Sequence, residues 1–407
     1  MKTHTHASNT MKALVVICSV LMFSQNIYTQ NWSTFNGGIA GWGYSTTVYN
    51  NELYAGGDFG ILRWDGFNWV SLGTGVNGSV RALTVYNNKL IAGGFFTIAG
   101  GKMVNYIAQW DGTKWTDLEG GADSYVVSLA VYNGTLIAGG YFKHMNIRAD
   151  YIARWNGHTW STMGSGMAGT EGQVMALTVY NNNLIATGFF TKAGGKAANH
   201  IAKWNDNDSA WSAMSSGLGG IGYALAVYNG NLIAGGLFNS AGGIAANDVA
   251  KWNGSKWSPL GKGIGGGTYG YVFALTVYNN HLIAGGIYTH AGDYSAENIA
   301  KWNDTSWTPL ATAMSSGGTV QAVEAVTVFS NYLVVVGIFG SIDGAGAGNI
   351  AAYRNAYPNN SISTGPIIGE FSCPKTMNIS YTATGNYKAS NVFTAQLSDG
   401  DGRPLIN

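Results

Sequence analysis

Charged side chains are scarce in this chain of 407 residues, and their near-balance excludes several classes of protein. Asp, Glu, Lys and Arg make up 10% of the residues, and the net charge at pH 7 is +1. Binding to nucleic acid calls for a basic face, so a nucleic-acid partner is not expected. A disordered chain would combine high charge with low hydrophobicity, whereas 46% of this chain is hydrophobic. The composition therefore predicts a folded protein.

Cysteine and proline are also rare, with two Cys and six Pro. So few prolines exclude a collagen-like or proline-rich chain. Cys18 lies in the apolar N-terminal segment and Cys373 near the other end, so a disulfide framework or a cysteine metal cluster is not expected. The histidines stand in loops and turns without the spacing of metal ligands. We therefore expect no metal and no cofactor.

Long apolar runs are absent as well. The apolar run Ala13–Phe23 is too short to span a bilayer, and Lys2 and Lys12 precede it. This pattern is typical of a secretory signal, which we place at residues 1–30, with an uncleaved membrane anchor as the alternative. The mature protein is then expected to be secreted or held at the cell surface, with no membrane span.

Glycine and aromatic residues are abundant, and they belong to an internal repeat. There are 60 Gly, 14 Trp, 23 Tyr and 15 Phe. Each repeat contains four short apolar runs of the type V-x-A-L-T-V-Y, L-I-A-G-G-x-F, I-A-x-W and W-x-x-L. The aromatic residue that ends the first run marks seven copies, spaced by 37 to 51 residues: Tyr49, Tyr86, Tyr132, Tyr180, Tyr228, Tyr278 and Phe329. Such a period indicates a repeat architecture.

Turn chemistry separates the runs and predicts their arrangement. Asn-Gly and Asp-Gly pairs such as Asn133-Gly134 and Asp111-Gly112 favour tight hairpins between runs one and two and between runs three and four. Four antiparallel strands in each repeat of about 45 residues are typical of a β-propeller blade. The seventh repeat has no fourth run, and residues 31–35 resemble it. We expect an all-β, seven-bladed propeller over residues 31–357, closed by this N-terminal strand.

The repeat resembles the kelch motif of the galactose oxidase-like propellers. The shared features are an apolar strand ending in Gly-Gly, an aromatic residue in the third strand and a Trp that opens the fourth. The resemblance covers about residues 31–357 and implies a fold rather than a function, because propellers include binding proteins and enzymes. The copper site of galactose oxidase requires a cysteine cross-linked to tyrosine, and residues 31–357 contain no Cys.

The repeat stops after Pro358. Residues 358–366 are rich in Ser, Asn and Gly and are expected to form a linker. Residues 367–407 resemble Ig-like modules of secreted Bacteroidota proteins, which often precede a type IX secretion sorting domain. About 40 residues are too few for a sandwich of about 100 residues, so we interpret this segment as a truncated, incomplete sandwich-like module.

The candidate binding residues lie where the repeat varies. Strand direction places the long loops on one face of the propeller, and function in a rigid scaffold concentrates on such loops. One position near the start of each inner strand varies most, and its aromatic and charged members are the predicted ligand-binding residues: Tyr44, Arg81, Tyr223, Phe273 and Glu324. The alternative is that these are ordinary residues beside loops. Arg81 and Glu324 are either a ligand-binding pair or a salt bridge.

Two functions fit these residues. The leading hypothesis is a monomeric secreted or cell-surface scaffold that binds an extracellular glycan or protein, with no catalytic residue, because aromatic, weakly charged loops suit sugar stacking. The alternative is a carbohydrate-active hydrolase or lyase with carboxylates at the channel mouth. Such an enzyme needs two carboxylates facing a substrate, for which Glu324 with Asp58 or Asp123 are candidates.

Overall fold

The computed structural model describes residues 32–169, 171–265, 270–316, 320–354, 361–364 and 381–384. The chain divides into two compact units, residues 31–354 and residues 1–30 with 355–407. Every regular element among the described residues is a β-strand. The same residues contain no helical segment with the length and hydropathy needed to cross a bilayer. The expected all-β class is therefore confirmed.

Seven four-stranded antiparallel sheets make up the described part of residues 31–354. Sheet 1 contains β2 (Gly43–Tyr49), β3 (Glu52–Gly57), β4 (Gly60–Trp64) and β5 (Trp69–Ser71), and sheet 2 contains β6 (Val80–Tyr86), β7 (Lys89–Gly94), β10 (Ile107–Trp110) and β11 (Trp115–Thr116). Sheet 3 contains β12 (Val126–Tyr132), β13 (Thr135–Gly140), β14 (Ile152–Trp155) and β15 (Trp160–Thr162), and sheet 4 contains β17 (Gln173–Tyr180), β18 (Asn183–Phe189), β21 (Ile201–Asn205) and β22 (Ala210–Ala213). Sheet 5 contains β23 (Ile221–Tyr228), β24 (Asn231–Leu237), β27 (Val249–Trp252) and β28 (Trp257–Pro259), and sheet 6 contains β30 (Tyr271–Tyr278), β31 (His281–Ile287), β34 (Ile299–Trp302) and β35 (Trp307–Pro309).

Sheet 7 joins the two ends of this unit. It contains β37 (Ala322–Phe329), β38 (Tyr332–Ile338), β41 (Ile350–Tyr353) and, as its fourth strand, β1 (Trp32–Thr34). β1 runs antiparallel to β41, with Trp32 opposite Tyr353 and Thr34 opposite Ala351. This is the pairing expected from the missing fourth run of the last repeat.

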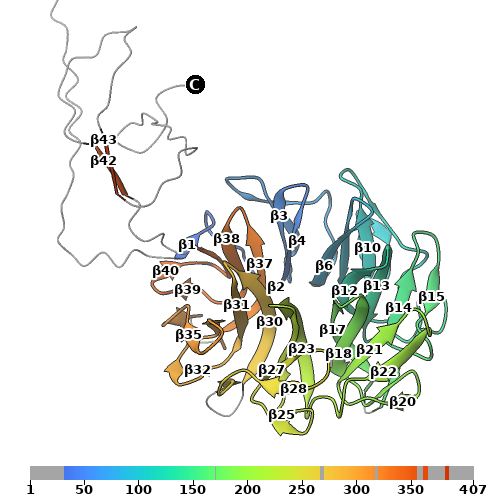
Figure 1. The fold of residues 1–407 in the computed structure, drawn as a ribbon. Coiled ribbons are helices and arrows are strands. Elements are labelled where there is room, and N and C mark those ends of the chain that lie inside the picture. The colour runs from blue at the N-terminus through green and yellow to red at the C-terminus, as the bar shows by residue number, and fades with distance from the viewer. Residues whose placement is uncertain are drawn as a thin grey trace, which may run out of the picture. The chain divides into compact units, whose positions relative to one another are not determined.

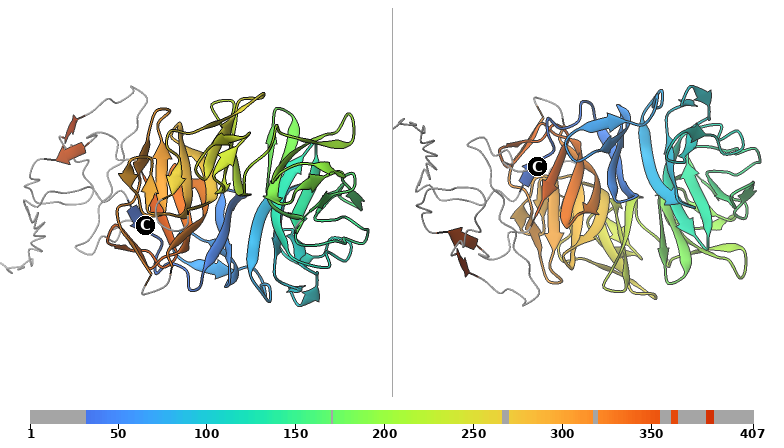
Figure 2. Two further views of the ribbon diagram at one scale, coloured as in Figure 1. Left: turned by 90° about the horizontal axis from the view of Figure 1, so that it is seen from below. Right: turned by 90° about the horizontal axis from the view of Figure 1, so that it is seen from above.

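The first strands of the sheets lie innermost, around a common axis (Figure 1). Each contacts the first strands of the preceding and following sheets, and β2 contacts both β6 and β37. The views from below and from above show neighbouring sheets of residues 31–354 side by side (Figure 2). The start of every first strand, where the predicted site residues stand, therefore lies near the same axis.

Short strand pairs extend the long connectors between second and third strands. They are β8 (Ile98–Ala99) with β9 (Lys102–Met103), β19 (Lys192–Ala193) with β20 (Lys196–Ala197), β25 (Ser240–Ala241) with β26 (Ile244–Ala245), β32 (His290–Ala291) with β33 (Tyr294–Ser295) and β39 (Ser341–Ile342) with β40 (Ala345–Gly346). Three further strands pair with these from the segment between sheets: β16 (Met167–Ala168), β29 (Ile264–Gly265) and β36 (Met314–Ser315). In sheet 1 the corresponding connector is only Asp58-Phe59, since Gly57 pairs with Gly60.

The second unit has two described strands, β42 (Ser361–Thr364) and β43 (Tyr381–Thr384), which pair antiparallel. β42 falls within residues 358–366, which the composition predicts to be linker, so part of that segment forms a strand instead. The predicted signal at 1–30 lies outside the described residues, as does most of the predicted Ig-like module at 367–407.

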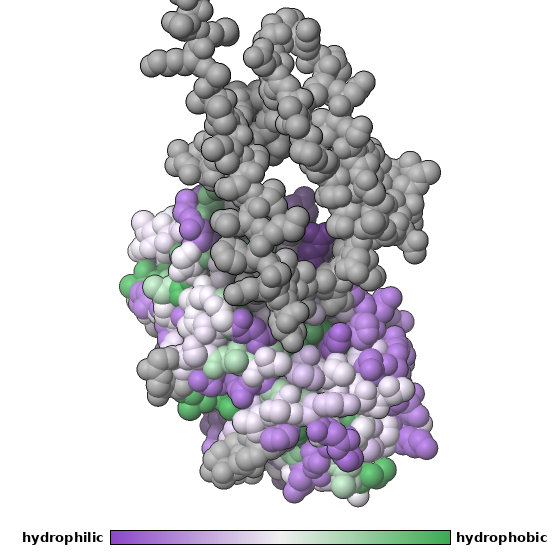
Figure 3. All heavy atoms as spheres, turned by 90° about the vertical axis from the view of Figure 1, so that its left-hand side faces the viewer, coloured by the Kyte–Doolittle hydropathy of each residue, from purple (hydrophilic) through white to green (hydrophobic). Residues whose placement is uncertain are grey.

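The repeated tryptophans pack the sheets together. The two Trp rings of sheets 1 to 6 lie 5.1–5.4 Å apart between centroids, and in sheet 7 the rings of Trp32 and Tyr353 lie 5.0 Å apart. In sheets 2 to 7 the Trp of the fourth strand also donates its indole N–H to a backbone carbonyl of the preceding sheet, as Trp160 does to Leu118 at 2.9 Å. These residues serve the packing of the sheets. On the face shown in Figure 3, hydrophilic and hydrophobic residues are mixed.

Candidate functional site on the inner strands

The predicted site position is a β-bulge in all seven sheets. The pairing register between first and second strands shifts at one residue in each sheet, which leaves that residue without a partner: Tyr44, Arg81, Val127, Met175, Tyr223, Phe273 and Glu324. A bulge inserts an extra residue, frees its side chain from the regular alternation and is common next to functional sites. The repeat thus provides seven equivalent positions whose side chains are free to vary.

Tyr44 and Arg81 form one half of the candidate site. The guanidinium carbon of Arg81 lies 3.5 Å from the ring centroid of Tyr44 and 4.8 Å from that of Phe95. Asp58 positions this pair from the short connector of sheet 1, because its carboxylate accepts the Tyr44 hydroxyl at 3.1 Å and the Ser79 hydroxyl at 2.7 Å. A cation packed against two aromatic rings is favourable, and more so when it is partly desolvated.

Arg81 has no acceptor for its five N–H donors among the described residues. Its Nε is buried without a hydrogen-bond partner, and the guanidinium makes no ion pair within that part of the chain. The alternative left open by the sequence, a salt bridge between Arg81 and Glu324, is therefore not formed. A partly buried guanidinium without acceptors is costly, so the site is suited to an acceptor supplied by a ligand.

Glu324 stands near Arg81 without contacting it. Burial raises the pKa of Glu324 to about 7, and the positive charge of Arg81 opposes the rise. Burial likewise raises the pKa of the Tyr44 hydroxyl to about 12, with Arg81 lowering it and Asp58 and Glu324 raising it. All three residues thus share one partly desolvated environment, in which Glu324 is half-protonated near neutral pH.

Tyr223 and Phe273 form the other half of the candidate site. Their rings lie 5.4 Å apart in an edge-to-face arrangement, and Tyr271 stacks on Phe273 at 5.4 Å. Burial raises the pKa of Tyr223, and the neighbouring Tyr271 and Tyr141 raise it further. The structure therefore brings the five predicted residues together as two groups, Tyr44 with Arg81 and Glu324, and Tyr223 with Phe273.

Four aromatic residues of the site were missed by the sequence analysis. Phe95 and Tyr125 lie 3.9 Å apart between ring centroids, Tyr125 contacts Tyr141 at 6.0 Å, and Tyr271 packs as described above. Phe95 and Tyr141 follow the Gly-Gly of the second strand, and Tyr125 and Tyr271 precede the bulge by two residues. We call the combined set the axial cluster: Tyr44, Arg81, Phe95, Tyr125, Tyr141, Tyr223, Tyr271, Phe273 and Glu324.

The carboxylates proposed as partners of Glu324 have different surroundings. Asp123 accepts the backbone N–H groups of Lys143 and His144 and contacts the His144 ring at 2.8 Å, so it holds a loop of sheet 3. Asp58 is bonded to Tyr44 within the axial cluster. Of the two candidates, only Asp58 shares the environment of Glu324. Within the described residues, no group of three or more His, Cys, Asp or Glu is arranged to hold a metal ion.

The fold defines the class of this protein. It is a β-propeller, since the chain is similar to the WD40 β-propeller domain of Doa1, with a TM-score of 0.50, 14% identity and coverage of 77% of this chain and 94% of that one. No protein-family model and no curated protein sequence matches the chain.

A second likeness is to the extracellular domain of BT4673 from B. thetaiotaomicron, described as a one-component or hybrid two-component system. The two structures of that domain give TM-scores of 0.54 and 0.52 at 11% identity and cover 82% of this chain. This chain spans only 41% and 40% of their length. At such identity the likeness concerns the fold alone.

Proposed function

We propose that this protein is an extracellular binding scaffold that recognises a glycan at the axial cluster. The observation that carries the proposal is Arg81, whose guanidinium packs over the Tyr44 and Phe95 rings and whose buried Nε has no hydrogen-bond partner among the described residues. Sugar rings present apolar faces that stack on aromatic side chains and oxygens that accept hydrogen bonds from a guanidinium. Aromatic side chains with a few polar groups are typical of sites for such a ligand.

The finer architecture and the location belong to the same proposal. The seven sheets are the blades of one closed, kelch-like propeller, with β1 completing the last blade, followed by an incomplete Ig-like module. The protein is a monomer that is exported by a signal within residues 1–30, and it resides outside the cell or on its surface. The likeness to an extracellular domain of BT4673 supports this location. No cofactor and no nucleic acid take part.

A glycan array with the purified chain tests the proposed function. For a glycan found there, Arg81→Ala and Tyr223→Ala should each weaken binding by about 10- to 100-fold, which corresponds to about 1–3 kcal/mol. The melting temperatures of both variants should stay near that of the wild type, because the bulged residues lie outside the tryptophan packing. Arg81→Lys should also lose affinity, since an ammonium does not reproduce the planar stack on Tyr44.

Trp110→Ala is the matched control for this experiment. Trp110 is 9% exposed and belongs to the packing of sheet 2, so its truncation should lower the melting temperature. Unchanged glycan affinity in both Arg81→Ala and Tyr223→Ala would remove the axial cluster from the proposed function. Capture of a protein ligand by the same residues, without any glycan, would contradict the glycan as ligand.

A carbohydrate-active hydrolase is the second candidate, and Glu324 is the observation in its favour. A general acid of a glycosidase needs a pKa near the working pH, and Glu324 has a pKa of about 7 beside Asp58 and Tyr44. Reaction products formed from the bound glycan by wild type but not by Glu324→Gln would establish this function. Binding without product formation would support the scaffold.

A further inference from the structure

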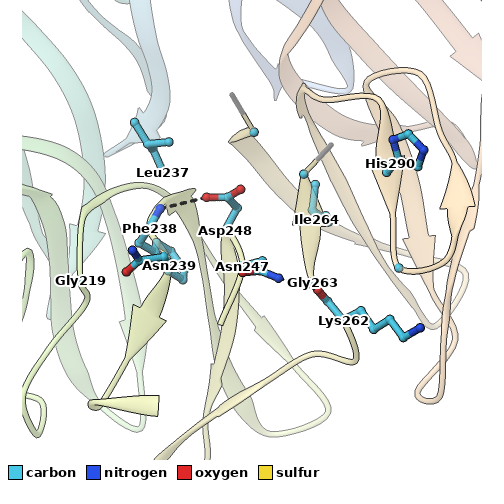
Figure 4. Close-up of a pocket in the computed structure, with 13 residues that line it drawn as sticks. Gly219, Leu237, Phe238, Asn239, Asn247, Asp248, Lys262, Gly263, Ile264 and His290 are labelled. Carbon is cyan, nitrogen blue, oxygen red and sulfur yellow. Dashed lines mark hydrogen bonds between the residues drawn. The ribbon is translucent and has the colours of Figure 1, made fainter. Parts of the chain in front are cut away.

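A separate cavity of about 580 Å³ lies between the loops of sheets 5 and 6 (Figure 4). None of the residues of the axial cluster lines it. Its polar lining side chains are Asn239, Asn247, Asp248, Lys262 and His290. Glycines form much of the remaining wall, which lets a ligand approach the backbone closely: Gly219, Gly263, Gly265, Gly270 and Gly292. The volume falls within the range of small-molecule sites.

Asp248 is the buried acid of this cavity. It is 9% exposed, stands directly before β27 and adopts a positive φ of 58°, which Asn and Asp tolerate better than most residues. One carboxylate oxygen, Oδ1, accepts the backbone N–H of Phe238 at 2.9 Å, as Figure 4 shows. This bond fixes the carboxylate and directs its second oxygen away from Phe238.

The following two repeats have asparagine at the same position. Asn298 and Asn349 also have positive φ, and their Oδ1 atoms accept the equivalent backbone N–H groups at 2.9 Å. Their Nδ2 groups donate in turn, from Asn298 to the sulfur of Met314 at 3.7 Å and from Asn349 to the Ile39 carbonyl at 3.1 Å. Asp248 keeps the structural bond, but an oxygen replaces the amide donor.

That oxygen, Oδ2, has no hydrogen-bond donor and no counterion among the described residues. It lies against Gly270, where an added Cβ would come within 2.5 Å of it. Lys262 lines the cavity, but it pairs with Asp293. His290 is the other titratable group of the described lining, and its Nδ1 contacts the Thr289 hydroxyl at 3.0 Å. Burial raises the pKa of Asp248 to about 7, with the bond from Phe238 opposing the rise.

We propose that this cavity binds a small ligand that carries a protonated amine, whose ammonium group donates to Oδ2 of Asp248. A buried carboxylate without a counterion is strongly unfavourable, and an ammonium supplies both the charge and the donors that it lacks. A neutral hydroxyl would provide a donor but leave the charge uncompensated. The site is independent of the glycan proposed for the axial cluster.

Three sugars of similar size test the proposal on the full chain by isothermal titration calorimetry at pH 7.5. Glucosamine carries the amine, glucose replaces it with a hydroxyl, and N-acetylglucosamine replaces it with a neutral amide. We expect saturable binding of glucosamine at least 10-fold tighter than that of either neutral sugar. Asp248→Asn should weaken glucosamine binding at least 10-fold, because it removes the charge and restores the side chain found in the next two repeats.

Asp208→Asn is the charge-matched control, since Asp208 is an exposed turn residue of sheet 4 outside the cavity. It should bind glucosamine as the wild type does. No binding of glucosamine, equal binding of all three sugars, tighter binding of N-acetylglucosamine, or full affinity in Asp248→Asn would each overturn the proposal. If Asp248→Asn fails to fold, the comparison of the three sugars on the wild type still decides the question.

Discussion

At the scale of single residues, both proposed sites depend on polar groups that the scaffold leaves unsatisfied. Among the described residues, the buried Nε of Arg81 has no hydrogen-bond partner and one carboxylate oxygen of Asp248 has no donor. At the position of Asp248, the next two repeats hold Asn298 and Asn349, each with two hydrogen-bond partners. In the two proposals, each of these groups gains its missing partner when a ligand binds.

The pKa of Glu324 predicts a pH-dependent cost in stability. Its folded pKa of about 7 lies above the ordinary value of 4.5, so the folded protein binds this proton more tightly than the unfolded chain does. The resulting stabilisation is present at low pH and is lost as the pH rises to about 7. The stability of Glu324→Gln relative to the wild type should therefore be about 1–2 kcal/mol higher at pH 8 than at pH 5. This value includes a reduction because the carboxyl group is partly exposed to solvent.

Urea unfolding of both proteins at the two pH values measures this difference. Glu119→Gln serves as the control, because Glu119 is an exposed turn residue and its substitution should change stability equally at pH 5 and pH 8. A Glu324→Gln effect that is the same at both pH values would show that the carboxyl group is well solvated in the folded protein.

At the scale of elements, the repeat makes the same inter-sheet hydrogen bond six times and omits it once. The tryptophan of the fourth strand donates its indole N–H to a backbone carbonyl next to the preceding sheet. That carbonyl belongs to the third residue after the fourth-strand tryptophan of the preceding sheet, as between Trp160 and Leu118. In sheet 1 the preceding strand is β1, and the equivalent carbonyl is that of Phe35. It accepts the Gly38 N–H, as Leu118 accepts the Gly121 N–H, but among the described residues it accepts no indole N–H. Trp69 packs on the Phe35 ring at 5.5 Å, but its buried Nε1 has no partner.

Replacing each tryptophan with phenylalanine should reveal this difference. Trp160→Phe loses a hydrogen bond and leaves the Leu118 carbonyl with one partner fewer, whereas Trp69→Phe removes an unsatisfied donor. We expect Trp160→Phe to cost about 1–2 kcal/mol more in the free energy of unfolding than Trp69→Phe. Equal losses, measured by urea denaturation, would mean that the indole bond contributes nothing beyond ring packing.

The strands and their pairing could be predicted from the sequence because the same apolar runs recur between turns of known chemistry. The Asn-rich turns have the expected positive φ, for example 46° at Asn133, and β1 pairs where the missing run predicts it. The bulges could not be predicted, since they depend on the register between two strands. Tyr44 and Arg81 were found because their position varies, although the stack between them depends on side-chain geometry.

The remaining parts of the two sites were missed for a related reason. Phe95 directly follows β7 and Tyr125 directly precedes β12, and only the fold brings their ring centroids to 3.9 Å. The sequence analysis did not single out Asp248. The signal that could have found it is the substitution of Asp for Asn at the residue before the third strand, compared with Asn298 and Asn349.

At the scale of the whole molecule, the proposed ring is closed by three residues of β1. Trp32 is the centre of this seam: it is 3% exposed, packs against the Tyr353 ring and donates its indole N–H to the Leu310 carbonyl at 3.1 Å. Closure removes the free edge that an open array of sheets would present. The stability of all seven sheets should therefore depend on this one short strand. A substitution in β1 should lower it far more than a substitution of another residue near the N-terminus.

Trp32→Ala tests this dependence, with Trp42→Ala as its control. Trp42 is the other tryptophan outside the six pairs, and it is 45% exposed. Truncating the buried Trp32 should cost about 3–5 kcal/mol, because the ring contacts, the hydrogen bond and the pairing of β1 are lost together. Truncating Trp42 should change stability by less than about 0.5 kcal/mol.

Thermal and urea unfolding, followed by tryptophan fluorescence and by far-ultraviolet circular dichroism, measure the stability of both variants. Equal and small effects of the two substitutions would contradict closure through β1, whereas a large loss for Trp32→Ala with coincident transitions by both probes would show that the seam stabilises the sheets as one cooperative unit.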